Sequence, residues 1–418
     1  MKRFLSFVIA FVLVLSTFVG CSKPTSNQSQ DTNQQGELKP EEGATIVVWE
    51  SQGAEGDFIK YAAQEFEKRY GIKVKFEPVE STQTVNKLQQ DGPAGVGADI
   101  IAAPHDQLGK MVAAGLIQPN HNPERFKKDF LEAAVQGITY EGEIYGYPIG
   151  IETYALFYNK DIIKQPPKTF EEIIEFAKKY NNPKEKKYAL MWNVGDPYYS
   201  YSFLSAFGGY VFGNNGTNKD DIGLNNEGAI EGAKYFKSLR SIYDVKQKDA
   251  NYQFMSGQFE NNKAAMIING PWAVAGYKKA KVNFGVAPLP TMKGKQPISF
   301  SGIRGLYLSS FTKYPNAAKL FLDFVTSDEL LLKRFEMTGQ IPPVKSLMDK
   351  PEIKDDPIVA GFMAQAQYST PMPSIPQMSL VWEPLGAAFS AIWDGKMEPK
   401  EALDKAVQII KDAIATQK

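Results

Sequence analysis

The chain has 418 residues, and its 47 basic and 47 acidic side chains cancel at neutral pH. A chain of this length exceeds the size at which one hydrophobic core keeps growing, so at least two folded units are expected. The balanced charge argues against a nucleic-acid-binding surface or a polybasic membrane surface. A neutral partner is favoured, and the 12% of aromatic residues suits a sugar or another flat ligand.

Residues 1–20 are predicted to be a secretory signal peptide, because a charged start is followed by a short apolar run and small residues. Cys21 is the only cysteine, so no disulfide framework is expected. Gly20 before it resembles part of a bacterial lipobox, although Phe18 stands where leucine is usual. We expect lipid on Cys21, with a cysteine that is cleaved away or buried as the alternative. The polar composition that follows predicts a disordered tether over residues 21–43.

The first folded segment is predicted to form a strand, a helix and a second strand. Residues 45–49 (TIVVW) are a β-branched apolar run, which is typical of a strand buried in a parallel sheet. Residues 58–70 repeat apolar side chains at helical spacing, and Gly71 is suited to end that helix. Residues 72–76 alternate in polarity, so a right-handed βαβ unit is the simplest assembly.

A third buried strand is predicted at residues 99–103 (DIIAA), and Asp106 lies just beyond its carboxyl end. In open α/β sheets, ligands bind outside the carboxyl ends of the strands. This rule places Asp106 near a binding crevice. It also places there the polar residues that follow the first strand, Glu50, Ser51 and Gln52.

Residues 146–161 (GYPIGIETYALFYNKD) indicate a crossing from one α/β lobe into another. The run at 154–158 is apolar and of strand length, and it ends at a polar turn. Glu152, just before this strand, would lie in an inter-lobe crevice, where ligand sites concentrate. The alternative is that Glu152 is only a surface acid at a hinge.

The second lobe is predicted to continue with a helix from Thr169 to about Tyr180, because Thr169 and Glu172 form a capping box. A strand at 188–192 leads into residues 196–201 (DPYYSY), an aromatic cluster around a proline turn. The pattern leaves two interpretations open, since these rings either pack in a core or offer their faces to a ligand.

Two tryptophans are predicted at turns or helix starts. The strand at 264–269 ends at a sharp Gly-Pro turn that presents Trp272. A proline-broken stretch precedes a helix that begins near Leu380 and carries Trp382. The remaining predicted elements are strands at 284–286 and 306–308, a helix from 317 and a structural helix over 401–416.

No catalytic or metal site has local support in the sequence. His105 and His121 lack metal-ligand spacing, and one cysteine excludes multi-thiolate sites. The best enzyme hypothesis is a glycosidase that uses two of Glu152, Asp106 and Asp196. Carboxylates that only accept hydrogen bonds from a polar ligand are the simpler interpretation, so we expect no enzyme activity, no metal and no cofactor.

Several separated motifs occur in the order and spacing of one family, from about Thr45 almost to Lys418. They are GADIIAAPHDQLG, YGYPIGIETYALFYNKD, PPKTFEEI, FGGYVF, AAMIINGPWAV and MPSIPQMSLVW. In these motifs the chain resembles the maltose- and maltodextrin-binding proteins of bacterial ABC importers. The resemblance implies an α/β, two-lobed periplasmic-binding-protein-like fold, in which each lobe is a mostly parallel sheet flanked by helices.

The resemblance also implies three interlobe crossovers, near residues 151–154, 301–305 and 352–357, with the sugar closed between the lobes. The predicted domains are the signal peptide at 1–20, the lipidated disordered tether at 21–43, the N-terminal lobe at 44–150 and 305–351, and the C-terminal lobe at 155–300 and 358–418.

Position by position, the resemblance implies polar sugar ligands from both lobes and a set of stacking rings. The predicted substrate-binding residues are Ser51, Gln52, Asp106, Glu152, Asp196, Tyr198, Tyr199, Trp272 and Trp382. The chain departs from the best-known members at Ala103, where they have tryptophan, and at Gly53-Ala54, where they have an Asp-Lys pair. It also has Gln107 and Gly386 at positions of arginines, so fewer charged groups would hold each glucose unit.

The expected function is that of an extracellular substrate-binding lipoprotein, which captures maltodextrin-type oligosaccharides in the interlobe cleft and delivers them to an ABC permease. The expected partners are the sugar, the transmembrane permease subunits and, through the lipid anchor, the membrane. No nucleic acid is expected, and the protein is expected to be a monomer on the extracellular face of the cell membrane. The alternatives are a binding protein for a cyclodextrin or galacto-oligosaccharide and a secreted glycosidase.

Overall fold

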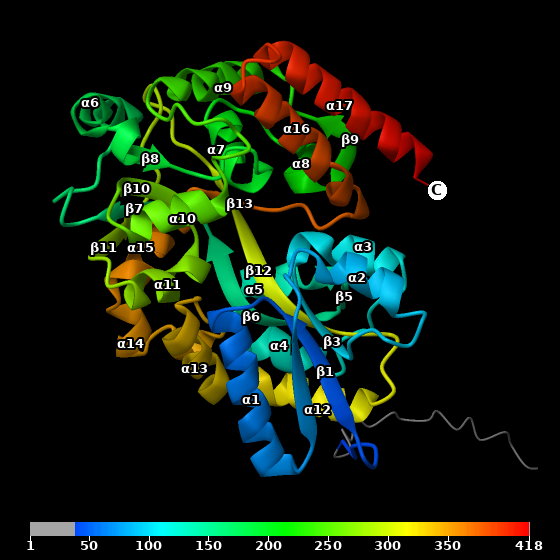
Figure 1. The fold of residues 1–418 in the computed structure, drawn as a ribbon. Helices are drawn as coiled ribbons and strands as arrows, with labels where there is room; N and C mark the ends of the chain where they lie inside the picture. Colours follow the sequence, from blue (N-terminus) through cyan, green and yellow to red (C-terminus); the bar gives the residue numbers. More distant parts are fainter. Residues whose placement is uncertain (1–37, 418) are drawn as a thin grey trace, which may run out of the picture. The chain divides into compact units, whose positions relative to one another are not determined.

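The computed structural model describes residues 38–417 (Figure 1). The predicted signal peptide, Cys21 and most of the predicted tether lie outside the described residues. The described strands assemble into two main sheets, and helices pack against both. This arrangement confirms the predicted α/β class.

The first sheet has the strand order β13-β12-β3-β1-β2, and β6 pairs with β12. Its strands are β1 (Thr45–Glu50), β2 (Lys73–Pro78), β3 (Ile100–Pro104), β6 (Gly146–Thr153), β12 (Ser299–Leu308) and β13 (Ser369–Pro371). β1 is parallel to both β2 and β3, and α1 (Ala54–Tyr70) connects β1 to β2, as the βαβ prediction requires. Gly71 ends α1 in the left-handed conformation, with a φ of 70°.

The second sheet has the order β11-β7-β10-β8. Its strands are β7 (Ala155–Asn159), β8 (Tyr188–Met191), β10 (Ala264–Asn269) and β11 (Phe284–Ala287). β10 is parallel to β8, but β7 is antiparallel to both β10 and β11. The prediction of a mostly parallel sheet is therefore wrong for this sheet. β7 follows β6 of the first sheet after one residue, Tyr154, and so enters the second sheet directly, where both of its neighbours run in the opposite direction.

The strand β13 lies inside the range 358–418 that was predicted for the C-terminal lobe. It nevertheless pairs in parallel with residues 299–301 of β12, at the edge of the first sheet. β13 therefore belongs to the first sheet, and the lobe boundaries stay a prediction. The strands outside the two main sheets are β4 (Thr139–Tyr140), β5 (Glu143–Ile144) and β9 (Asn218–Ile222).

The helices divide between the two sheets (Figure 1). Beside the first sheet lie α1, α2 (Thr84–Asp91), α3 (Leu108–Ala113), α4 (Pro123–Asp129), α5 (Glu132–Gly137), α12 (Pro315–Val325) and α13 (Asp328–Thr338). Beside the second lie α6 (Phe170–Tyr180), α7 (Pro197–Ser205), α9 (Glu227–Ser238), α10 (Tyr252–Glu260), α11 (Val274–Lys279), α15 (Pro357–Ala366), α16 (Trp382–Trp393) and α17 (Pro399–Thr416). Short helices are α8 (Gly213–Gly216) and α14 (Pro351–Lys354), with 3-10 turns at His105–Gln107, Pro183–Glu185, Leu239–Ser241, Pro271–Ala273, Lys345–Leu347 and Pro376–Leu380. Across residues 38–417, no helix combines the length and apolar character needed to cross a membrane.

Side-chain caps fix the start of two helices beside the second sheet, α6 and α7. The Thr169 hydroxyl accepts a hydrogen bond from the backbone N–H of Glu172, and this confirms the predicted cap of α6. Asp196 caps α7 in the same way by accepting from the N–H of Tyr198. The aromatic cluster at 196–201, predicted around a proline turn, is therefore the first turn of a helix with Pro197 at its first position.

The last residues of the segment that was predicted to be a disordered tether, residues 21–43, make defined contacts in the structure. The Glu41 carboxylate accepts hydrogen bonds from the backbone N–H groups of Asn316 (2.9 Å) and Ala317 (3.1 Å) at the start of α12. The Asn316 side chain also donates to the carbonyl of Lys39. A carboxylate at a helix N-terminus satisfies free N–H donors and is favoured by the helix dipole, which explains why residues 39–41 are fixed.

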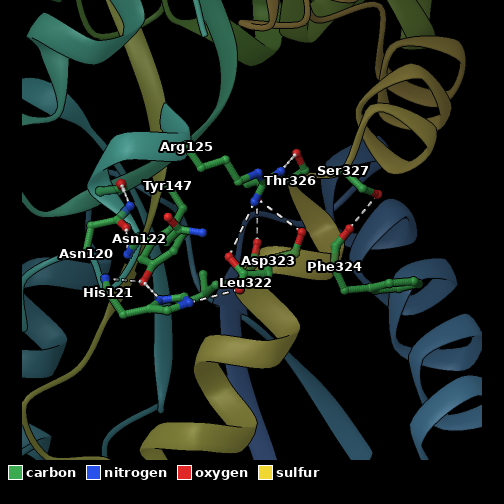
Figure 2. Close-up of polar contacts among 11 residues, drawn as sticks. Asn120, His121, Asn122, Arg125, Tyr147, Leu322, Asp323, Phe324, Thr326 and Ser327 are labelled. Atoms are coloured by element: carbon green, nitrogen blue, oxygen red, sulfur yellow. Dashed lines mark hydrogen bonds and ion pairs between the residues drawn. The ribbon is translucent and has the colours of Figure 1, made fainter. Parts of the chain in front are cut away.

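Figure 2 shows a polar cluster that joins β6 to α12. His121 Nδ1 lies 2.7 Å from the Tyr147 hydroxyl, and His121 Nε2 lies 2.9 Å from Asp323 Oδ2. Arg125 donates to the other Asp323 oxygen at 3.3 Å and to the carbonyl of Thr326 at 2.6 Å. Because Tyr147 belongs to β6, this cluster anchors the strand that carries Glu152, and His121 has a structural role.

Candidate functional site

The predicted site acid Glu152 lies near the end of β6, where the chain passes from the first sheet to the second. β6 runs antiparallel to β12, and Glu152 is opposite Gly302. The chain leaves the first sheet after Thr153, and β7 begins in the second sheet at Ala155. Glu152 is only 7% exposed, so it is a buried carboxylate at the crossing and not a surface hinge acid.

Three of the four predicted stacking rings form one cluster. The ring centroid of Tyr198 lies 6.0 Å from that of Trp272 and 5.6 Å from that of Tyr199. Tyr199 and Trp272 are 6.4 Å apart. The tyrosines belong to the first turn of α7, where the sequence predicted a proline turn. Trp272 belongs to the 3-10 turn after β10, and the sequence predicted a turn there. Tyr198 and Trp272 are partly exposed, whereas Tyr199 is buried.

Phe300 links this cluster to the fourth predicted ring. Its centroid lies 6.1 Å from that of Tyr198 and 5.8 Å from that of Trp382. The indole Nε1 of Trp382 donates to Asp106 Oδ2 at 3.0 Å, so contacts run without a break from Trp272 to Asp106. The sequence analysis missed Phe300, although its place directly before the predicted crossing at 301–305 was a signal that could have found it.

The Ser51 hydroxyl oxygen accepts two hydrogen bonds, and its hydrogen stays free to donate. Its oxygen accepts hydrogen bonds from the Ser81 backbone N–H at 3.0 Å and from Arg304 Nη2 at 3.1 Å. A hydroxyl oxygen has two acceptor positions, so the hydroxyl hydrogen of Ser51 is left for a ligand oxygen. Gln52, the next residue, is exposed, and its side chain makes no hydrogen bond in the part of the chain that the structure describes.

Burial raises the pKa of all three predicted site acids, to about 7 for Glu152 and to about 6 for Asp106 and for Asp196. The positive charge of Arg304 opposes the rise for Glu152. Burial also raises the pKa of Tyr198 well above its usual value, and the charges of these three acids add to that rise.

Asp196 already has a structural role as the cap of α7. Its Oδ1 accepts from the Tyr198 N–H at 2.9 Å, and its Oδ2 accepts from Asn193 Nδ2 at 3.2 Å. A carboxylate has about four acceptor positions, so both oxygens keep capacity for a ligand hydroxyl. The sugar-binding role of Asp196 stays a prediction.

A buried charge cluster supports the crossing and was largely missed by the sequence analysis. Arg304 donates to both carboxylate oxygens of Glu50, with Nε to Oε2 at 3.3 Å and Nη2 to Oε1. Glu55, Arg334 and Gln340 are buried beside them. These residues come from β1, α1, β12, α13 and the loop after α13, and single charges on separate elements give no local sequence signal.

A cavity of about 360 Å³ adjoins the row of rings. It is lined by Tyr201 and Phe300, by residues 210–216 with Asp221, and by Thr370, Pro371 and Pro373. The rings of Tyr201 and Phe300 stack on each other, with centroids 3.9 Å apart and planes 9° apart. The stacked faces cover each other and both residues are buried, so this pair offers little ring surface to a ligand.

The two histidines have structural partners. His105, beside Asp106, accepts from the Ile303 N–H at Nδ1 (3.1 Å), and its Nε2 lies 3.0 Å from the Met372 carbonyl. Burial lowers its pKa to about 4, so it is neutral at physiological pH. Within residues 38–417, no group of three or more His, Cys, Asp or Glu side chains is arranged to hold a metal ion.

Comparison with known proteins assigns this chain to a family. Residues 61–361 match the family model described as bacterial extracellular solute-binding protein. The chain belongs to this family of bacterial extracellular solute-binding proteins. As in the solved structures of its relatives, the solute-binding protein has the two-lobed periplasmic-binding-protein fold.

Three relatives of this solute-binding protein carry names that refer to oligosaccharides. A galactooligosaccharide-binding protein of Bacillus subtilis is 34% identical, over 89% of this chain and 90% of its own length. A maltodextrin-binding protein of the same organism is also 34% identical, over 86% of this chain and 87% of its own length. A solved cyclo/maltodextrin-binding protein in complex with maltotetraose is 40% identical, with a TM-score of 0.74, over 90% of this chain and 98% of that chain.

Proposed function

We propose that this solute-binding protein is the receptor of an ABC sugar importer and that it binds maltodextrins. The observation that carries the proposal is the row of rings formed by Trp272, Tyr198, Phe300 and Trp382, which ends on Asp106. A glucose unit has an apolar C–H face that packs on a ring and hydroxyl groups that donate to carboxylates. Three partly exposed rings, Trp272, Tyr198 and Trp382, are bordered by acids and linked through the buried ring of Phe300. This arrangement suits a chain of glucose units.

The proposed lobes would share the sugar between them. Ser51 and Asp106 belong to the range 44–150 of the N-terminal lobe, and the rings of Tyr198, Trp272 and Trp382 belong to the C-terminal lobe. A sugar gains both sets of contacts only when the lobes are together, so ligand binding selects the closed arrangement. Binding a sugar in this way requires hydrogen-bond acceptors and stacking surfaces but no bond cleavage. We therefore infer a receptor and not an enzyme.

The second candidate is a receptor for galacto-oligosaccharides, which the relative with that name favours. Titration calorimetry with maltose, maltotetraose, a cyclodextrin and a β-galactan tetrasaccharide separates the two. Binding of maltotetraose supports the proposal. Tight galactan binding without maltodextrin binding would replace maltodextrin by galacto-oligosaccharide as the ligand class.

Longer maltodextrins are expected to bind at least about tenfold more tightly than maltose, a difference of roughly 1.4 kcal/mol. The residues Ala54, Gln107 and Gly386 provide no charged groups for single glucose units, so stacking on successive rings must supply more of the affinity. One extra ring contact with a hydrogen bond gives a difference of that size. In the same calorimetry, maltose that binds as tightly as maltotetraose would contradict the stacking argument.

Gly270→Ala is expected to weaken maltotetraose binding at least about fivefold, by displacing one stacking ring. A Cβ at position 270 would lie 2.1 Å from the indole of Trp272, so the ring must move. The φ of −114° at Gly270 suits alanine, and the backbone stays unstrained. Gly257→Ala is the control, since a Cβ there meets no atom within 4 Å. Equal affinities of the two variants would show that Trp272 does not contact sugar.

Cys21→Ser is expected to release the protein from the cell membrane into the medium with its sugar affinity unchanged. The sequence STFVGC motivates a lipid on Cys21, and a single acyl chain holds only marginally, so a double-chain anchor is expected. Cell fractionation followed by immunoblotting measures the distribution. A variant that stays on washed membranes would contradict the lipid anchor.

A further inference from the structure

Gln340 is placed against the strand that carries Glu152. It follows α13, where Gly339 turns the chain with a φ of 77°. The backbone N–H of Ile151 donates to the carbonyl of Ile341 at 2.9 Å, next to both side chains. Gln340 is 1% exposed. The backbone therefore places the Gln340 side chain beside that of Glu152.

The orientation of the Gln340 amide is set by charged neighbours on both sides. Its Nε2 donates to Glu152 Oε1 at 2.6 Å and to Glu55 Oε1 at 3.4 Å. Its Oε1 accepts from Arg334 Nη2. A reversed amide would point its oxygen at two carboxylates and its hydrogens at a guanidinium, so only one orientation is favourable.

Charged and titratable groups face Glu152 from five elements. They are Arg304 on β12, Arg334 on α13, Glu55 on α1, Glu50 on β1 and Tyr198 on α7. With the carboxyl and guanidinium groups ionised and Tyr198 neutral, the glutamates including Glu152 exceed the two arginines by one negative charge. A donor to Glu152 is therefore needed to keep its ionised form stable, and Gln340 provides that donor at the shortest distance.

The two oxygens of Glu152 have different surroundings. Oε1 accepts from Gln340 and lies 3.9 Å from Arg304 Nη1. Oε2 carries no hydrogen bond in residues 38–417. We propose that Gln340 is a positioning residue, which holds Oε1 of Glu152 so that Oε2 is presented as the acceptor for a sugar hydroxyl. This inference rests on the proposed function and adds a residue to the predicted site.

The proposal gives Gln340 an effect on protonation that a packing role would not have. Gln340→Met keeps the length and burial of the side chain but removes the donor. Loss of a hydrogen bond to the ionised form raises the pKa of Glu152, by about 1 to 2 pH units for a bond to a charged group. Ionised Glu152 accepts the sugar hydroxyl, so sugar affinity is highest above this pKa and falls as pH decreases through it.

The experiment compares the wild-type protein with Gln340→Met and Gln365→Met. Gln365 is the matched control, because it is a fully buried glutamine whose bonds go to Leu289 N, Ser299 Oγ and the Tyr368 carbonyl and to no charged group. The Glu152 carboxyl is titrated by carbon-13 NMR without sugar, with Glu152→Gln used to assign its signal. Maltotetraose affinity is measured by calorimetry from pH 5.5 to 9.5.

We expect the Glu152 pKa to rise in Gln340→Met and to stay unchanged in Gln365→Met. At pH 7.5 Gln340→Met should bind maltotetraose about tenfold more weakly than wild type, and the difference should shrink towards pH 9.5. An unchanged Glu152 pKa would overturn the proposal, as would an equal loss of affinity at every pH. Wild type that binds no maltodextrin while the pKa still rises would overturn the proposed function instead, and with it the acceptor role of Oε2.

Discussion

Trp382→Ala is expected to weaken maltotetraose binding by about 30-fold or more, which corresponds to about 2 kcal/mol. Trp382 has two roles in the site, because its ring continues the row through Phe300 and its Nε1 donates to Asp106 at 3.0 Å. Trp382 lies at the start of α16, and it is partly exposed. Calorimetry gives the affinity, and the thermal unfolding midpoint without sugar should change little.

Trp382→Phe separates the two roles. It retains an aromatic ring and removes the donor to Asp106, so we expect a smaller loss of affinity than in Trp382→Ala. If Trp382→Ala instead lowered the unfolding midpoint strongly and kept the sugar affinity of wild type, Trp382 would be a core residue and the row of rings would end at Phe300.

Arg304→Met is expected to lower the free energy of unfolding by about 3–5 kcal/mol at pH 7.5. Arg304 is buried, donates to both oxygens of Glu50 and to the Ser51 hydroxyl, and lies 3.9 Å from Glu152 Oε1. Its removal leaves a fully buried Glu50 without its cation. Urea-induced unfolding, followed by tryptophan fluorescence, measures the change.

Arg334→Met is the matched comparison, and it should cost less stability than Arg304→Met. Arg334 is fully buried as well, but its Nε and Nη1 have no hydrogen-bond partner in the described chain, and its guanidinium lies 5.2 Å from the Phe58 ring. Those unpaired donors carry a desolvation cost that methionine removes. Equal stability losses in the two variants would show that the hydrogen bonds of Arg304 are not what holds the cluster together.

The sequence predicted most of the elements that position the site, because their signals are local. The apolar runs of β1, β3, β7 and β10, the capping box of α6 and the stop at Gly71 depend on residues close together in the chain. The direction of β7 in its sheet is not a local property, since it is defined against β10 and β11, which come much later in the chain. The prediction of a mostly parallel second sheet failed for this reason.

The residues of the candidate site also fall into those with a local sequence signal and those without one. Motifs identified the rings of Tyr198, Trp272 and Trp382, which the structure connects through Phe300. The groups that hold the acids were not predictable, because Gln340 meets Glu152 across 188 residues of sequence. Likewise, the contact of Glu41 with α12 spans 275 residues, so composition alone assigned that glutamate to a disordered tether.

The proposal that this protein binds a maltodextrin and leaves it intact is tested most directly by recovering the sugar from the complex. The buried acids Glu152 and Asp106 have raised pKa values, which a glycosidase would also use for a general acid. Labelled maltotetraose is incubated with an equal amount of protein, the complex is isolated, and the sugar is analysed by mass spectrometry. We predict one intact maltotetraose per protein after prolonged incubation. Release of glucose or shorter maltodextrins, or a protein that emerges without sugar, would contradict the account.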